Sequence, residues 1–186
     1  MLRDFRHGYI AFFIFLLAPS GGAFYCAAVG QSDYTYISSY FSDYFANSIN
    51  YDAVLKKALI NNTVLGIILF SCAFFKFGIL FILSAIFKEG FVKGFCCACL
   101  CRCMGLSGAC LSAASELHML ILIPFMIISA DKSMKMSRNI SPNSKNSKIF
   151  FVFFQILVIT IFCACAFMEC YVNTTFMVFL HGKLIK

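Results

Sequence analysis

Three ionisable side chains of this chain lie in long apolar runs, where charge is unfavourable. Lys76 is the only charged residue of the apolar run 64–87, and Glu116 and His118 lie in the next apolar stretch. A lysine at the centre of a bilayer costs about 2.5–3.5 kcal/mol on insertion scales, so it needs a partner or a function. The sequence therefore predicts an ion pair between Lys76 and Glu116.

The spacing of Lys76 and Glu116 allows this pair to form. Lys76 lies 11 residues from Phe87, and Glu116 lies 10 residues from Leu106, which is roughly 15–16 Å along an α-helix in each case. Gly108, Ser112 and Glu116 recur every four residues, and small residues at this spacing let helices pack closely in lipid. Glu116 is therefore expected to point into a helix bundle.

Two interpretations of the charged pair stay open. The pair fixes the register of two helices, or, with His118, it lines a polar route for an ion or a proton or contacts a partner subunit. His118 lies two residues beyond Glu116, on roughly the opposite side of a helix, and a hydrogen-bonded packing role is expected for it. Ser112 and Gln155 are the other polar side chains that could line such a route, and Gln155 is expected to join neighbouring helices.

Five of the eleven cysteines crowd one short segment that also carries lysine and arginine. Juxtamembrane cysteines beside basic residues are favoured sites of reversible S-acylation, and each buried methylene of an acyl chain contributes about 0.8 kcal/mol to membrane attachment. The spacing does not match the paired two-residue spacing of structural zinc sites. Unmodified packing thiols, or metal or redox chemistry, are the alternatives. The expected S-acylation sites are Cys96, Cys97, Cys99, Cys101 and Cys103.

The elements that position these side chains are apolar segments long enough to cross a bilayer. Hydrophobic residues make up 61% of the 186-residue chain and charged residues 12%, whereas soluble domains carry about 25% charged residues. A run of 18 or more apolar residues with almost no charge is long enough to span. We expect an all-α, multi-pass membrane helix bundle that forms a single domain over residues 1–186. Its four transmembrane helices are predicted at residues 9–29, 64–87, 106–130 and 149–170.

Three polar segments connect these predicted helices. Residues 31–62 are rich in Tyr and Ser, and the aromatic residues between Ile37 and Phe45 recur with a helical period. This pattern predicts a short amphipathic helix in the membrane interface, where tyrosines form an aromatic belt. Residues 88–105 form the Cys-rich connection, and residues 131–148 are expected to form a basic polar loop.

The N-terminal segment also has two interpretations. Arg3 and Arg6, then an apolar stretch and small residues, match a cleavable signal peptide, which would leave three transmembrane helices. An uncut first helix is favoured here. Lys76 apart, the basic residues divide seven to seven between the two sides of the membrane, so the positive-inside rule does not set the orientation. The signal-like start favours a cytoplasmic N-terminus. An endomembrane or the plasma membrane is the expected location, and a mitochondrial membrane stays open.

Composition and motifs restrict the class of function. The net charge of +7 lies mainly in short loops, where phospholipid headgroups are the default partners. No basic face carries a nucleic-acid recognition motif, so nucleic acid is not an expected partner. The sequence shows no catalytic triad, phosphate-binding loop or metal triad, so neither a cofactor nor a metal is expected.

We therefore expect a non-enzymatic integral membrane protein that acts as a structural or accessory subunit or scaffold of a membrane assembly. Its expected partners are the lipid bilayer and other membrane protein subunits. One alternative is a small channel or transporter that uses Lys76, Glu116 and His118, and another is a membrane thiol oxidoreductase. The four-helix layout is tetraspan-like, but the chain has no Trp and no Cys-Cys-Gly motif, so the sequence assigns no family.

Overall fold

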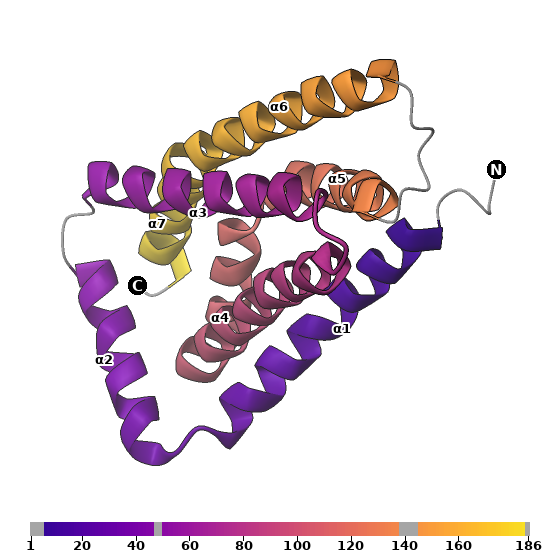
Figure 1. Cartoon of the computed structure of the whole chain (residues 1–186). Helices are drawn as coiled ribbons and strands as arrows, with labels where there is room; N and C mark the ends of the chain where they lie inside the picture. Colours follow the sequence, from indigo (N-terminus) through magenta and orange to yellow (C-terminus); the bar gives the residue numbers. More distant parts are fainter. Residues whose placement is uncertain (1–5, 47–49, 138–144, 185–186) are drawn as a thin grey trace.

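The computed structural model describes residues 6–46, 50–137 and 145–184, and Figure 1 shows these residues as helices that pack side by side. No strand occurs in these ranges, so the predicted all-α fold is confirmed. The helices are α1 (Arg6–Ala28), α2 (Gln31–Ala46), α3 (Tyr51–Cys72), α4 (Gly78–Ser115), α5 (Met119–Ser137), α6 (Lys145–Phe167), the π-helix η1 (Met168–Asn173) and α7 (Thr174–Leu184).

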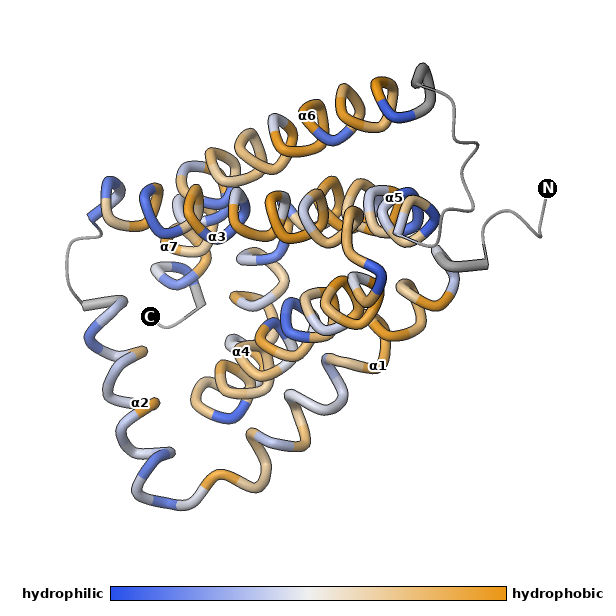
Figure 2. Tube along the Cα trace, viewed as in Figure 1, coloured by the Kyte–Doolittle hydropathy of each residue, from blue (hydrophilic) through white to orange (hydrophobic). Residues whose placement is uncertain are grey.

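Four segments within the described ranges are helical, long and apolar enough to cross a membrane, namely residues 8–28, 51–72, 78–115 and 148–183. Large apolar side chains on their outer faces are exposed, among them Phe24, which is 79% exposed, and Phe153, which is 68% exposed. Figure 2 shows apolar residues along most of α6 and hydrophilic residues over much of α2. Helices satisfy their own backbone hydrogen bonds, as a lipid-embedded chain must. The protein is therefore a multi-pass integral membrane helix bundle.

Helices α1 and α4 run parallel and lie against each other (Figure 1). Gly90 and Gly94 of α4 face Ala18 and Pro19 of α1, and a Cβ atom on Gly94 would collide with the Pro19 backbone. Glycines four residues apart permit this close approach of two helices in lipid. The small side chains of α4 therefore set the position of α1.

Helix α6 runs antiparallel to α3 and is also joined to α5. The Asn62 amide of α3 donates to the Phe162 carbonyl of α6 at 3.3 Å. Gln155 of α6 is buried, and it accepts from Ser129 and donates to Ser133 of α5, both at 2.7 Å. Buried apolar residues from α1, α3, α4, α5 and α6 form the main core around these contacts.

Polar side chains hold both ends of α1. The Gly8 N–H in the first turn donates to Asp131 Oδ1 at 2.9 Å, which satisfies a free backbone group at the helix N-terminus. At the other end Arg102 Nη1 donates to the Cys26 carbonyl at 2.9 Å. The Arg102 guanidinium also lies 4.2 Å from the centre of the Tyr34 ring, so this side chain ties α2 to the junction of α1 and α4.

The predicted helix 64–87 is wrong, because the chain turns in the middle of that apolar run. Helix α3 ends at Cys72 and α4 begins at Gly78. A Cβ atom on Gly78 would collide with the Cys72 carbonyl, so the turn depends on glycine at this position. The residues on both sides of the turn are apolar, and hydropathy therefore does not reveal it.

The predicted Cys-rich connection 88–105 is also wrong, because these residues belong to α4. The helix reverses direction at Gly105, whose φ of 59° and ψ of −133° are not helical. We call residues 78–104 and 106–115 the two arms of the α4 hairpin. The predicted helix 106–130 is correspondingly divided into the second arm, a turn at residues 116–118, and α5.

Two further predicted boundaries change. Residues 131–137 of the predicted polar loop continue α5, and α6 already starts at Lys145, whereas residues 138–144 lie outside the described residues. The predicted helix 149–170 continues through η1 into α7. Within the Tyr-rich segment a short helix, α2, forms as predicted, residues 47–49 lie outside the described residues, and residues 51–62 belong to α3.

Candidate functional site

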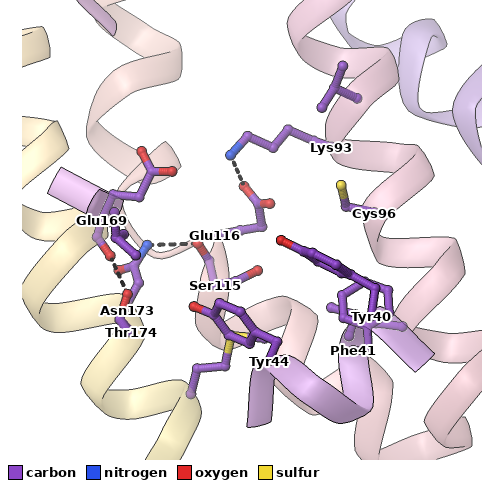
Figure 3. Close-up of a pocket in the computed structure, with 14 residues that line it drawn as sticks. Tyr40, Phe41, Tyr44, Lys93, Cys96, Ser115, Glu116, Glu169, Asn173 and Thr174 are labelled. Atoms are coloured by element: carbon purple, nitrogen blue, oxygen red, sulfur yellow. Dashed lines mark hydrogen bonds and ion pairs between the residues drawn. The ribbon is translucent and has the colours of Figure 1, made fainter. Parts of the chain in front are cut away.

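A cavity with ionisable side chains in a largely apolar wall lies where the α4 hairpin faces α2 and the helical segment that follows α6 (Figure 3). Its volume is about 280 Å³, and we call it the Lys93 cavity. The apolar part of its wall includes Val92, Leu100 and Met177. The charged and amide side chains that line it are Lys93, Glu116, Glu169 and Asn173.

In this cavity Glu116 pairs with Lys93, not with Lys76. Lys93 Nζ lies 3.5 Å from Glu116 Oε2, and the two side chains are 25% and 28% exposed. Lys76 is exposed in the turn between α3 and α4. The predicted Lys76–Glu116 pair is therefore wrong, because the turn before Gly78 places Lys76 at an end of α4 whereas the hairpin returns Glu116 to the middle of that helix.

The α4 hairpin accounts for the pairing of Lys93 and Glu116. The two residues lie 12 and 11 positions from Gly105 along the chain, so the two antiparallel arms bring them to the same level. Gly108 lies so close to the Leu100 backbone that a Cβ atom there would collide with it. The predicted inward direction of the Gly108 and Ser112 face agrees with their burial.

One asparagine in the lining of the Lys93 cavity, Asn173, joins two chain segments. The Asn173 amide nitrogen donates to the Ser115 carbonyl and contacts His118 Nδ1, both at 2.7 Å. A carbonyl can only accept a hydrogen bond, so the nitrogen of this amide must face Ser115. His118 Nδ1 is then an acceptor, and the proton of the neutral ring lies on Nε2, which is 3.6 Å from Glu169 Oε2.

Two irregular backbone segments place these groups. The turn at residues 116–118 ends the helical path of α4, so Glu116 and His118 both lie near the site even though a continuous helix would point them to opposite sides. Glu169 and Asn173 belong to the π-helix η1. Such π-turns are rare and occur frequently at functional sites.

Burial changes the pKa of both titratable groups in the 116–118 turn, which lies between the candidate spans. It raises the pKa of the Glu116 carboxyl, and the Lys93 ammonium opposes this effect. It lowers the pKa of His118 to about 4, and the positive charge of Lys93 contributes in the same direction. His118, which is 1% exposed, is thus neutral at physiological pH, as its hydrogen bond from Asn173 requires.

Aromatic side chains of α2 form the wall of the Lys93 cavity opposite Asn173. Tyr40, Phe41 and Tyr44 line it, and Figure 3 shows the Tyr40 and Tyr44 rings beside Ser115 and Glu116. These residues belong to the helical aromatic stripe that we interpreted as an interfacial belt. The structure places these three residues beside polar groups, so α2 contributes to the wall of the cavity.

A second cavity, of about 380 Å³, lies between α3 and the start of α4. Phe81, Ala85 and Glu89 line it from α4, and Asn61 and Cys72 line it from α3. Lys88 Nζ lies 3.3 Å from Glu89 Oε1 at its rim. The α4 residues of both cavities share one face of that helix.

The five clustered cysteines have different environments on α4. Cys96 and Cys97 are exposed, Cys101 and Cys103 are half-buried, and Cys99 is 2% exposed. Cys96 lines the Lys93 cavity, whereas Cys99 Sγ lies 3.2 Å from Cys26 Sγ of α1. Acylation of Cys99 therefore conflicts with its burial, and S-acylation of the other four stays a prediction.

The two remaining predicted polar residues lie away from the cavity walls. Ser112 is buried on the second arm of α4, where its carbonyl accepts from the Ser115 hydroxyl at 2.8 Å. Gln155 is used in the α5–α6 contact. Sequence reasoning missed Lys93, Glu169 and Asn173 as site residues, and the available signal for Lys93 was a charge next to the small residues Gly90 and Gly94.

The fold and the site together define an all-α, multi-pass integral membrane protein with an open cavity beside a broken helix, whose largely apolar wall carries ionisable side chains. In the described ranges no three His, Cys, Asp or Glu side chains are grouped so that they could hold a metal ion. No protein-family model, curated protein or solved structure matches the chain.

Proposed function

We propose that the chain is a non-enzymatic membrane protein that passes a small solute across the bilayer along α4. The supporting observation is that the two cavities lie in series on one face of this helix, from Phe81 to Leu100. These residues are 19 positions apart, or roughly 28 Å at the α-helical rise. The hydrocarbon core of a bilayer is about 30 Å thick, so the two cavities together match its depth.

The charges along this face also support a route for a solute. Lys88 and Glu89 lie at the cavity between α3 and α4, and Lys93 and Glu116 lie at the Lys93 cavity. Ionisable residues within a membrane bundle are rare and mark substrate or ion pathways. Non-helical backbone at membrane depth is tolerated where it lines a cavity, and the turn at residues 116–118 lies beside the Lys93 cavity. Lys93 thus takes the place of Lys76 in the channel or transporter alternative.

Solute flux into liposomes that contain the purified chain tests this proposal. The panel comprises a small organic cation, a small organic anion and a neutral polyol. We expect flux of at least one of them above that of protein-free liposomes, and a several-fold reduction when Ala85→Leu narrows the cavity between α3 and α4. Asp33→Asn on the exposed start of α2 is the control. Equal flux with and without protein for the whole panel would reject transport.

A structural or accessory role is the second candidate, and a different observation favours it. Most buried polar side chains of the described bundle join two helices, such as Asn62 to α6 and Gln155 to α5. Such contacts stabilise a scaffold without any solute. Purification in mild detergent from native membranes tests this role, because an accessory subunit should elute with stoichiometric partner subunits. Elution of the chain alone would count against it.

The proposed location is an endomembrane or the plasma membrane, on the basis of the signal-like first segment. Fluorescence microscopy of the tagged chain beside organelle markers tests this. Co-localisation with a mitochondrial marker would contradict it.

A further inference from the structure

We propose that the Lys93 cavity binds a small primary ammonium ion. This inference rests on the proposed function in taking the cavity as part of the solute route, and it adds the chemical class of the solute. It is carried by two buried oxygen atoms that lack hydrogen-bond donors, by the charge of the lining residues and by the aromatic wall of α2.

The first oxygen atom belongs to Asn173. This residue is 2% exposed and lines the cavity, and its Oδ1 has no hydrogen-bond partner among the described residues. The orientation of the amide is fixed, because its nitrogen donates to the Ser115 carbonyl. Leaving a buried acceptor without a donor is unfavourable, so a ligand that brings an N–H group would satisfy it.

The second oxygen atom is Glu116 Oε2. It is buried and has no hydrogen-bond partner among the described residues, although Lys93 Nζ lies within ion-pair distance at 3.5 Å. Both atoms are acceptors, and no buried side-chain donor of the described cavity lacks a partner. The unpartnered buried atoms of the cavity are therefore acceptors, and an ammonium group brings three N–H donors.

The charges of the cavity select a cation. Lys93 is the lysine among its described lining residues, and Glu116 and Glu169 are the carboxylates, so a single positive charge makes the ionised set neutral. An anion would compete with Glu116 for Lys93 and would leave the two acceptor oxygens unsatisfied. The second carboxylate, Glu169, thus favours a bound cation.

The wall formed by α2 favours an organic cation over a bare metal ion. Tyr40, Phe41 and Tyr44 line the cavity, and aromatic faces attract ammonium groups through cation–π interactions. Calcium requires six to eight oxygen ligands, whereas this cavity offers few carboxylate and amide oxygens and already contains the Lys93 ammonium. Its volume of about 280 Å³ far exceeds the roughly 10–15 Å³ that one water needs on the same measure, so a small amine fits.

Ligand-observed NMR titration of the purified full chain in detergent tests the proposal. The probe is ethylammonium, and two matched ligands separate charge from hydrogen bonding. Ethanol has the same number of heavy atoms without the charge, and tetramethylammonium has the charge without an N–H donor. We expect a millimolar Kd for ethylammonium, since so small a ligand can make few contacts, and at least tenfold weaker binding of the other two.

Variants place the binding in the cavity. Glu116→Gln and Asn173→Leu should each weaken ethylammonium binding about tenfold or more. Asn173→Leu also removes the hydrogen bonds to Ser115 and His118, so Glu116→Gln, which keeps the side-chain shape, is the variant to rely on if the former fails to fold. Asp33→Asn makes the matching charge change outside the cavity and should leave the Kd unchanged.

The outcomes separate this inference from the proposed function. Equal binding of ethylammonium and ethanol, or binding that Glu116→Gln leaves unchanged, would overturn the ammonium assignment. Liposome flux confined to the anion or the polyol would overturn it as well, although transport would stand. Saturable ethylammonium binding without any flux would uphold the ligand class and reject transport.

Discussion

Lys93 and Glu116 approach to 3.5 Å across the α4 hairpin, although 23 residues separate them along the chain. Their pair joins the first arm of α4 to the turn that leads into α5. Charges in a low-dielectric interior attract strongly, but each also loses hydration. Removing one partner leaves the other charge without compensation.

The Lys93–Glu116 pair predicts a specific pattern in a double-mutant cycle. Lys93→Met or Glu116→Gln alone should lower stability by roughly 1–2 kcal/mol, less than the roughly 3–5 kcal/mol for a fully buried pair, because both side chains are about a quarter exposed. The stability loss of the double variant should be smaller than the sum of the losses of the two single variants. Thermal denaturation in detergent measures this. Additive losses would show that the pair contributes nothing, and Lys76→Met, at an exposed site, should change little.

Because the α4 hairpin reverses at Gly105, replacing this glycine should reduce the stability of the fold. Its φ of 59° with a ψ of −133° lies in a region that other residues seldom adopt, so Gly105→Ala should destabilise the fold by roughly 1–3 kcal/mol. A Cβ atom at Gly105 would meet no other atom within 4 Å, so backbone strain alone would cause the loss. The measurement is again the midpoint of thermal denaturation.

Gly182 is the matched control for Gly105. It lies in α7 and also has open space around it, but its φ is helical. Gly182→Ala should therefore leave stability unchanged or raise it slightly, because alanine favours the helix. An equal loss for both variants would mean that strain at Gly105 is not the cause.

The sequence predicted the apolar segments better than their ends. The runs near residues 9–29 and 149–170 correspond to α1 and α6, because a long uninterrupted apolar helix has only lipid and other helices to contact. The run 64–87 was misassigned because the turn before Gly78 occurs among residues that are apolar on both sides. Such a turn is stabilised by backbone geometry and by packing, which hydropathy does not record.

The candidate site was predicted only in part, for a similar reason. The four-residue spacing indicated a buried face, which agrees with the burial of Gly108 and Ser112, whereas Glu116 lies partly exposed in the turn after α4. The partner of Glu116 was wrong, because it depends on where the chain reverses, and Gly105 was one glycine among 11. Asn173 and Glu169 lie in a π-turn that has no recognisable sequence pattern, so no motif identified them.

His118 predicts a dependence of stability on pH. Its pKa is lowered to about 4 in the folded chain from an ordinary value of 6.5, so the unfolded chain binds the proton first as pH falls. Neutral His118 therefore makes its full contribution to the free energy of unfolding above pH 6.5, and this contribution is lost as the pH falls towards 4. By pH 5 the loss reaches about 2 kcal/mol.

A comparison with His118→Gln isolates this titration from that of other groups. Glu116 acts in the opposite sense. Its pKa is raised in the folded chain, so stability falls as the pH rises above the ordinary pKa of a glutamate. Lys93 and Glu169, which also face the site, remain in both proteins. Between pH 7.5 and pH 5 the denaturation midpoint of the wild type should therefore fall further than that of His118→Gln. A constant difference would show that His118 does not titrate in this range.

We expect Cys26 and Cys99 to form a disulfide between α1 and α4 when an oxidant is added. Their sulfur atoms lie 3.2 Å apart in a buried contact, so a shift of about 1 Å would bring them to bonding distance. An added membrane-permeant oxidant should remove two electrons and two protons from the two thiols. Mass spectrometry should then find one peptide pair linked through these residues, released by a reductant.

The same disulfide should stabilise the protein, because it closes a loop of 73 residues. Cross-links of this kind contribute roughly 2–4 kcal/mol, so the oxidised protein should denature at a higher temperature than the reduced one. Cys99→Ser should abolish both the linked peptides and the thermal shift. Cys96→Ser, three residues away on the cavity wall, should preserve both. Linkage of Cys96 to Cys99 instead would favour the thiol oxidoreductase alternative over a packing contact between α1 and α4.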